Sequence, residues 1–230
     1  MMNNYKIDTH VHTAEVSSCG KVPAAEVARL YKQQNYDAII ITDHYYSGYF
    51  DSLFSVRWED KVDAYLQGYR IAKAEGQKIG LKVLLGIEMR FDIHPNDYLI
   101  YGLDEEFLYK NPEMFRMTLP EFTAFKKGKG LAVFQAHPFR ARMEIEKNEY
   151  LDGIEVMNGN PRHDSNNCRA YKHALSNNLR MLSGSDFHQV PDLARGGLFM
   201  EEMPADSREF ADYLIGNRKV NLIGDLVLCA

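Results

Sequence analysis

Short apolar runs alternate with segments of helical periodicity along this chain, and that alternation limits its possible folds more than any other feature. Residues 37–42 (DAIIIT) form a β-branched run of the kind found in strands buried on both faces. Residues 59–78 place Val62, Tyr65 and Tyr69 on one helical stripe. Repeated strand–helix units predict an α/β fold with a mainly parallel sheet, either closed as a barrel or open and doubly wound. The other expected strands cover residues 5–12, 82–87, 98–101, 131–135, 153–157, 181–184, 197–200 and 220–223, and the other expected helices begin near Pro23 or cover residues 119–127, 167–176 and 207–215.

Potential metal ligands follow many of the predicted strands at the point where the strand ends. They are histidines and carboxylates: His10, His12, Asp43, His44, Glu88, Asp104, His137, Asp186 and His188. The C-terminal ends of the strands converge on one mouth in a barrel, whereas an open sheet spreads such residues along a crevice. The pattern therefore favours a barrel with its active site at the C-terminal ends of the strands. His10 and His12, two residues apart on the first strand, point to the same face.

The donors in this set are imidazole nitrogens and carboxylate oxygens, without a cluster of thiolates. Such a mixed set suits zinc, manganese or iron in a hydrolytic site better than a closed structural zinc site. Two or three divalent ions sharing a carboxylate and a bridging hydroxide would suit cleavage of a phosphate ester. Such a site requires no serine or cysteine nucleophile, and the chain has no G-x-S-x-G, P-loop or G-x-G-x-x-G motif.

Several short motifs, in this order, resemble those of the polymerase-and-histidinol-phosphatase (PHP) family. They are Asp8-Thr9-His10-Val11-His12-Thr13, Ser18-Cys19-Gly20, Thr42-Asp43-His44, Gly86-Ile87-Glu88, Ala136-His137-Pro138 and Gly184-Ser185-Asp186-Phe187-His188. The resemblance extends to about Gly197. It implies a single PHP domain over residues 1–230, folded as a distorted (β/α)7 TIM-like barrel with two or three metal ions in its mouth.

The resemblance also implies a role for each potential ligand. His10, His12 and Asp186 would hold the first ion, Glu88 would bridge the first and second, and His137 would hold the second. His44 and His188 would hold the third. Where several relatives have another histidine for the second ion, this chain has Asp104. Glu15 or Cys19 would complete the third site; we favour Glu15, and a two-ion site is the other outcome.

The resemblance implies a hydrolase that acts on phosphate esters, cleaving a phosphomonoester or a small phosphodiester. Glu88 and Asp186 would act at the metal site, and Arg140 would position the phosphate, with Arg195 and Arg162 as second choices. Four aromatic residues follow His44 and form either a substrate wall or packing at the barrel rim, and packing is the commoner role: Tyr45, Tyr46, Tyr49 and Phe50. The alternatives are an amidohydrolase-like deaminase or amidase and a non-catalytic metal-binding module.

Charge and composition favour a small substrate. The net charge is −5 and the pI is about 5.9, so the chain lacks a general basic surface for nucleic acid or anionic membranes. We therefore expect a small phosphorylated partner, such as a nucleotide or a sugar or amino-alcohol phosphate. No apolar run reaches transmembrane length, and the three cysteines have no C-x-x-C spacing. These features predict a cytoplasmic protein and leave the oligomeric state open.

Overall fold

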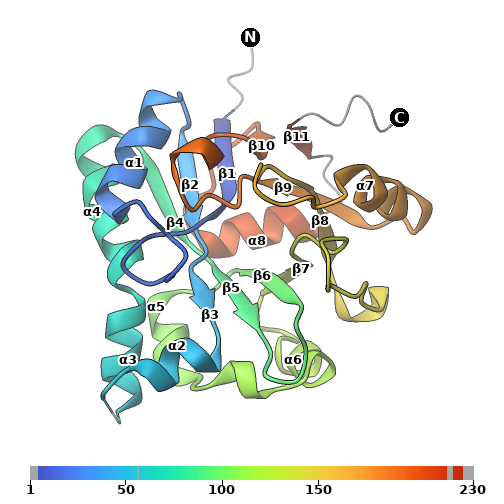
Figure 1. The fold of residues 1–230 in the computed structure, drawn as a ribbon, viewed down its shortest axis with the longest axis horizontal. Coiled ribbons are helices and arrows are strands. Elements are labelled where there is room, and N and C mark those ends of the chain that lie inside the picture. Colours follow the sequence, from blue (N-terminus) through green and yellow to red (C-terminus); the bar gives the residue numbers. More distant parts are fainter. Residues whose placement is uncertain (1–4, 56, 217–219, 225–230) are drawn as a thin grey trace.

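Two mixed sheets form the framework of the computed structural model, which describes residues 5–55, 57–216 and 220–224 (Figure 1). The strand order is β11-β10-β1-β2-β4 in the first sheet and β3-β5-β6-β7-β8-β9 in the second. The strands are β1 (Tyr5–Val11), β2 (Ala38–Ile41), β3 (His44–Tyr45), β4 (Lys82–Leu85), β5 (Ile87–Arg90), β6 (Asp97–Tyr101), β7 (Ala132–Gln135), β8 (Gly153–Asn158), β9 (Arg180–Gly184), β10 (Gly197–Met200) and β11 (Asn221–Ile223).

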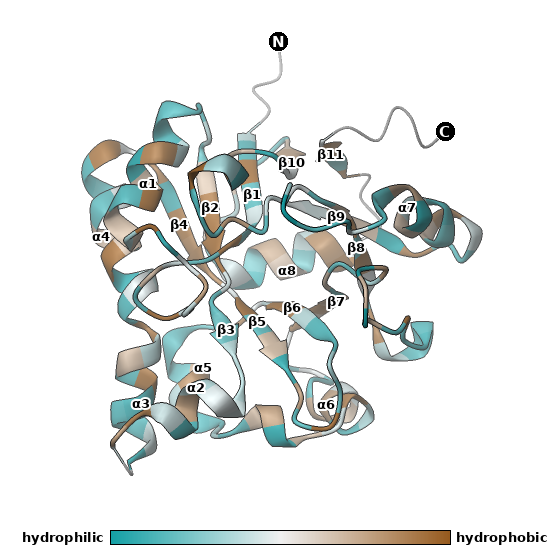
Figure 2. Ribbon diagram, viewed as in Figure 1, coloured by the Kyte–Doolittle hydropathy of each residue, from teal (hydrophilic) through white to brown (hydrophobic). Residues whose placement is uncertain are grey.

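Helices cover the outer faces of the sheets. Helices α1 and α4 pack against each other beside β4, α7 packs on β8 and β9, and α8 packs on β6 and β7. Figure 2 shows apolar stretches along the strands and mixed hydropathy on the helices. The helices are α1 (Ala24–Gln33), α2 (Ser47–Ser52), α3 (Trp58–Tyr65), α4 (Gln67–Ile79), α5 (Glu105–Lys110), α6 (Leu119–Phe125), α7 (Asn167–Ser176) and α8 (Ser207–Ile215), with short 3-10 turns η1 (Met114–Arg116), η2 (Asn148–Tyr150) and η3 (Val190–Asp192).

The α/β class agrees with the sequence, but the closed (β/α)7 barrel is not confirmed. Strands β5, β6 and β7 pair antiparallel, as do β1, β10 and β11, so the sheets are mixed rather than mainly parallel. The chain passes between the sheets through Thr42 and Asp43, which separate β2 from β3, and through Gly86, the single residue between β4 and β5. An isolated parallel bridge between Val11 and Phe187 also joins the segments at β1 and β9.

Two predicted elements are divided in the structure. The helix expected over residues 59–78 ends at Tyr65, and a second helix begins at Gln67. The strand expected over residues 82–87 breaks at Gly86, where an added Cβ would lie 2.9 Å from Thr42 Cγ2. The glycine therefore lets the chain pass closely over β2 as it moves from one sheet to the other. The other predicted strands and helices lie at their expected places, and their bounds differ by at most a few residues.

Cys19 and Cys168 differ in their chemical state. Cys19 is free and exposed, whereas Cys168 is disulfide-bonded. Cys229 lies outside the described residues. Among those residues, no helix combines the length and apolar character needed to cross a bilayer.

Candidate metal centre

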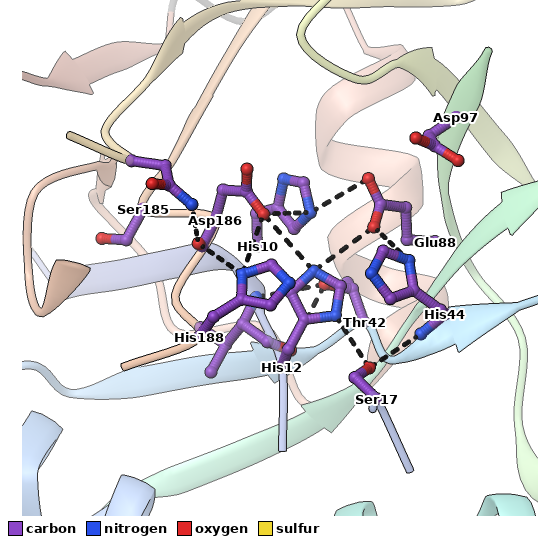
Figure 3. A network of polar contacts seen from close by, with 12 residues as sticks. His10, His12, Ser17, Thr42, His44, Glu88, Asp97, Ser185, Asp186 and His188 are labelled. Atoms are coloured by element: carbon purple, nitrogen blue, oxygen red, sulfur yellow. Dashed lines mark hydrogen bonds and ion pairs between the residues drawn. The ribbon is translucent and has the colours of Figure 1, made fainter. Parts of the chain in front are cut away.

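Histidines and carboxylates from both sheets converge on one buried site (Figure 3). His10 lies on β1, His44 on β3 and Glu88 on β5, while Asp186 and His188 follow the end of β9. Within each of three groups the donor atoms lie within 4.8 Å of one another: His10 with His12 and Asp186, His12 with His44 and His188, and Glu88 with Asp97 and His137. The first two groups share His12. Each group has the size and donor types of a metal site.

Glu88 lies at the centre of the site because of its position on β5. Its parallel cross-strand partner on β3 is His44, and His44 Nδ1 lies 2.8 Å from Glu88 Oε2. Glu88 Oε1 lies 3.1 Å from His137 Nε2 and 3.3 Å from His10 Nε2. Glu88 Oε2 is also 3.3 Å from His12 Nε2. One buried carboxylate thus contacts four imidazoles, as a bridging ligand would.

Hydrogen bonds at Nδ1 orient three of the imidazoles. His10 Nδ1 lies 3.0 Å from Glu155 Oε1, and His188 Nδ1 lies 2.9 Å from the Asp186 carbonyl oxygen. His12 Nδ1 lies 3.1 Å from Ser17 Oγ, which donates its own proton to Asp43. Because an oxygen faces each of these Nδ1 atoms, we assign the imidazole proton to Nδ1. The lone pair of Nε2 is then available to a cation.

Several buried polar atoms at the centre have no hydrogen-bond partner. They are His10 Nε2, His12 Nε2 and His137 Nδ1. A buried polar atom without a partner costs about 1–3 kcal/mol, so a cluster of them indicates a missing ligand. Imidazole nitrogens and carboxylate oxygens are suitable ligands for zinc, manganese or iron, so the residues present fit divalent cations.

The two carboxylates of the site stay ionised, as the ligands of a cation do. Burial would raise the pKa of Glu88, but the charges of His10 and His44 outweigh it and hold this pKa well below its usual range. Burial would also raise the pKa of Asp186, but the charge of His10 outweighs it and holds this pKa well below its usual range. Burial, with the charge of His12, lowers the pKa of His188 to about 3. Burial would lower the pKa values of His10 and His44, but the charge of Glu88 outweighs it and holds both well above their usual range. The ionised carboxylates are therefore paired with protonated imidazoles, whose protons a bound cation would replace.

Two of the candidate ligands sit on backbone of positive φ. His137 has a φ of 31° and Asp186 a φ of 50°. Non-glycine residues are uncommon in this region, although aspartate and histidine tolerate it better than most residues. The His137 turn is held by its backbone N–H, which donates to Glu155 Oε2 at 2.9 Å. Such locally unfavourable conformations concentrate at functional sites.

Arg140 lies at the edge of the site, as the sequence predicts. Its Nη2 is 2.7 Å from Asp186 Oδ2 and 3.0 Å from Asn158 Oδ1. The second choices are engaged elsewhere: Arg162 binds Asp192, and Arg195 Nε donates to the Pro191 carbonyl.

The packing interpretation suits two of the aromatic residues after His44. Tyr45 and Phe50 are fully buried. The partly exposed ring of Tyr46 instead lies 6.3 Å, centroid to centroid, from the His44 ring.

Two predicted ligands lie outside the site. Asp104 is exposed and accepts a hydrogen bond from Phe107 N at 2.7 Å, which caps α5. Its placement follows from the direction of β6, which runs antiparallel to β5 and ends away from Glu88. Both carboxylate oxygens of Glu15 accept from Ala24 N, at the start of α1. The free thiol of Cys19 instead lies near His44: burial would raise the pKa of the thiol, but the interaction with His44 outweighs it and lowers this pKa.

Sequence reasoning missed Asp97 and Glu155. Asp97 begins β6 opposite Arg90, on the same face as Glu88, and His137 Nε2 lies 3.9 Å from Asp97 Oδ2. A signal for Asp97 was present, because residues 91–96 are too few for a crossover between parallel strands and so predict a hairpin. Glu155 lies within an apolar run on β8, and an isolated carboxylate there gives no sign of its partners.

Comparisons with known proteins identify the family and the fold. The profile of the PHP domain family matches residues 8–219, which confirms the resemblance found in the sequence. No curated protein sequence matches.

Solved structures share the fold at low sequence identity. A two-domain Bacteroides vulgatus protein containing a predicted PHP-like metal-dependent phosphoesterase has a TM-score of 0.65 and 19% identity, over 96% of this chain and 65% of its own. PsfC from Pseudomonas syringae has a TM-score of 0.66 and 18% identity, over 99% of this chain and 97% of its own. An amidohydrolase from Chromobacterium violaceum with bound sulfate has a TM-score of 0.53 and 16% identity, over 92% of this chain and 98% of its own.

Proposed function

This chain belongs to the PHP domain family, and from that premise we propose that it is a metal-dependent hydrolase of small phosphate esters. The proposed substrate is a phosphomonoester or a small phosphodiester, such as a nucleotide or a sugar or amino-alcohol phosphate. The observation that carries this proposal is the set of unpartnered buried donors around Glu88, beside an arginine held at the site edge.

The proposal assigns two or three divalent ions to the three donor groups. His10, His12 and Asp186 would hold one ion, His137 and Asp97 a second, and Glu88 would be shared. His44 and His188 would hold a third, with the Cys19 thiol beside His44 as a further donor. When bound, the ions would supply Lewis acidity at the phosphate and lower the pKa of water towards neutrality.

The chain's own residues would bind and orient the substrate. Arg140 is the proposed phosphate-binding group, and Asp186 and Asn158 hold its guanidinium in place. Its Nη1 makes no hydrogen bond with any residue that the structure describes, so this donor is available to a phosphate oxygen. Asp186 thus both orients Arg140 and contributes to the metal site.

The test combines metal analysis with phosphate release. We expect the metal-replete protein to release phosphate from some members of a panel of mono- and diesters, and chelation to abolish release. Glu88→Gln, which keeps the side-chain shape, should lower kcat by at least about 100-fold, since ligand loss should exceed the 10- to 100-fold effects of losing a hydrogen-bond partner of a ligand. Glu106→Gln, on an exposed ion pair with Lys110, is the control and should leave kcat unchanged.

Amides belong in the same panel because an amidohydrolase shares the fold. Hydrolysis of amides without hydrolysis of phosphate esters would replace the proposed reaction class by that of an amidohydrolase. Metal binding without turnover of either class would indicate a non-catalytic module. Full activity of Glu88→Gln would contradict the proposed site itself.

A further inference from the structure

A second arginine flanks the metal centre in the same manner as Arg140. Arg140 binds Asp186, and on the other side of the site Arg90 binds Asp97 through two hydrogen bonds of 2.8 Å, from Nε and Nη2. Figure 3 shows Asp186 and Asp97 on either side of Glu88. Each arginine is therefore anchored on a carboxylate that belongs to a separate donor group of the centre.

Arg90 lines a cavity that adjoins the metal centre. The cavity has a volume of about 340 Å³ and lies between the segment after β3 and the β5–β6 loop; its walls are Tyr46, Ser47, Arg90, Phe91, Asp92, Ile93, His94 and Pro95. Two of its lining residues contact the centre. The Tyr46 ring lies 6.3 Å, centroid to centroid, from the His44 ring, and Arg90 binds Asp97, whose Oδ2 lies 3.9 Å from His137 Nε2. A substrate that extends past these side chains would place one group in the cavity and its phosphate at the centre.

The guanidinium of Arg90 is held in place and still has donors to offer. The two bonds to Asp97 fix its plane, and its side chain is 44% exposed. Within the described part of the chain its Nη1 makes no hydrogen bond. An arginine held in this way binds a carboxylate or phosphate with little further loss of side-chain freedom.

The other charged groups that line the cavity are less suited to bind an anion. Asp92 is an exposed carboxylate, and His94 Nε2 lies 3.6 Å from Glu144 Oε2. Arg90 is therefore the cation best placed to bind a ligand in the cavity.

We propose that the substrate carries a second anionic group, a carboxylate or a second phosphate, and that Arg90 binds this group in the cavity while the scissile phosphate lies at the metal centre near Arg140. This inference rests on the proposed function and adds the chemical class of the substrate. It makes Arg90 a specificity-determining residue rather than only a partner of Asp97.

The experiment compares matched substrates that differ only in the second anion. One pair is glycerol 3-phosphate and 3-phosphoglycerate, which tests a carboxylate. The other is glucose 6-phosphate and glucose 1,6-bisphosphate, which tests a second phosphate. In the metal-replete wild type we expect kcat/KM to favour the doubly anionic member of at least one pair by 10-fold or more. Arg90→Gln should remove most of that preference, mainly through KM.

The control and a binding measurement make the result decisive. Arg116→Gln removes a neighbouring exposed arginine that does not line the cavity, and it should keep the wild-type preference. Binding of 3-phosphonopropionate and propylphosphonate, measured by calorimetry, repeats the comparison without turnover. We expect the wild type to bind the phosphonocarboxylate at least 10-fold more tightly, and Arg90→Gln to bind both alike.

Failure of this inference is distinguishable from failure of the proposed function. If Arg90→Gln lowers kcat/KM and affinity equally for both members of each pair, Arg90 serves only to hold Asp97, and the inference is wrong. Equal use and equal binding of both members by the wild type would also overturn it. Lack of turnover of every phosphate ester would instead contradict the proposed function, and the binding comparison would still decide the role of Arg90.

Discussion

Glu155 connects two candidate ligands through one buried carboxylate. Its Oε1 contacts His10 Nδ1, and its Oε2 accepts from the backbone N–H of His137 and from Asn158 Nδ2. All three groups donate to it, so an amide in place of the carboxylate would bring one of its own N–H groups against a donor. The orientation of the His10 ring and the His137 turn therefore depend on the same side chain.

We predict that Glu155→Gln lowers affinity for divalent ions by about 10- to 100-fold, the usual effect of losing a hydrogen-bond partner of a ligand. The measurement is a dissociation constant from competition with a chelator. Glu149→Gln, at an exposed position on η2, should retain wild-type affinity. Unchanged affinity in Glu155→Gln would show that His10 and His137 are held without this carboxylate.

The site residues that the sequence predicts have partners close to them along the chain, whereas those that it missed have distant ones. His10 and His12 could be paired because both fall within the strand predicted over residues 5–12, where alternation gives them a common face, although β1 itself ends at Val11. Glu155 lies 145 positions from His10, and no local pattern connects them. Cys19 and Glu15 are close in sequence, but the sequence does not show that Glu15 caps α1. Only the folded geometry shows that its carboxylate is used there rather than at the metal centre.

At the scale of elements, the direction of β6 decides which aspartate reaches the metal centre. The succession of strands and helices along the chain, and most of their bounds, follow from apolar runs and helical periodicity. The direction of each strand and its neighbours in the sheet depend on its connections. The short 91–96 connection turns β6 antiparallel to β5, so its first residue, Asp97, lies at the site and its far end leads to Asp104. The expectation of a mainly parallel sheet was wrong here, and it produced the wrong ligand.

The two aspartates make a matched pair of variants. Asp97→Asn should lower the affinity or number of bound ions, because it removes a charged donor beside His137 and Glu88. Asp104→Asn should have no effect on metal binding, since asparagine caps a helix as well as aspartate does. Equilibrium dialysis with metal analysis measures both. Equal metal content in both variants would exclude Asp97 from the site.

At the scale of the whole molecule, the candidate centre joins the two sheets. Its residues come from β1 in one sheet and from β3, β5 and β6 in the other, with the segments after β7 and β9 completing it. Ions that bind only this arrangement stabilise the folded chain, by about 2.7 kcal/mol when the free ion is at 100 times its dissociation constant.

We therefore predict that chelation lowers the melting temperature by roughly 5–10 °C, using about 2–4 °C per kcal/mol for a chain of this size. Thermal unfolding followed by circular dichroism, with and without added zinc or manganese, measures the shift. Glu88→Gln should lose most of it. A wild-type protein that melts at the same temperature with and without chelator would not support a metal centre that spans both sheets.

The first strand pairs with the segment after β9, so the metal centre can be completed only late in synthesis on the ribosome. Asp8 accepts a hydrogen bond from Ser185 N, 177 positions later, and Val11 bridges Phe187 beside it. A nascent chain presents His10, His12 and His44 long before Asp186 and His188 have been made. Capture of the full set of ions must therefore follow translation of nearly the whole chain, so an ion bound earlier would be held by an incomplete set of donors.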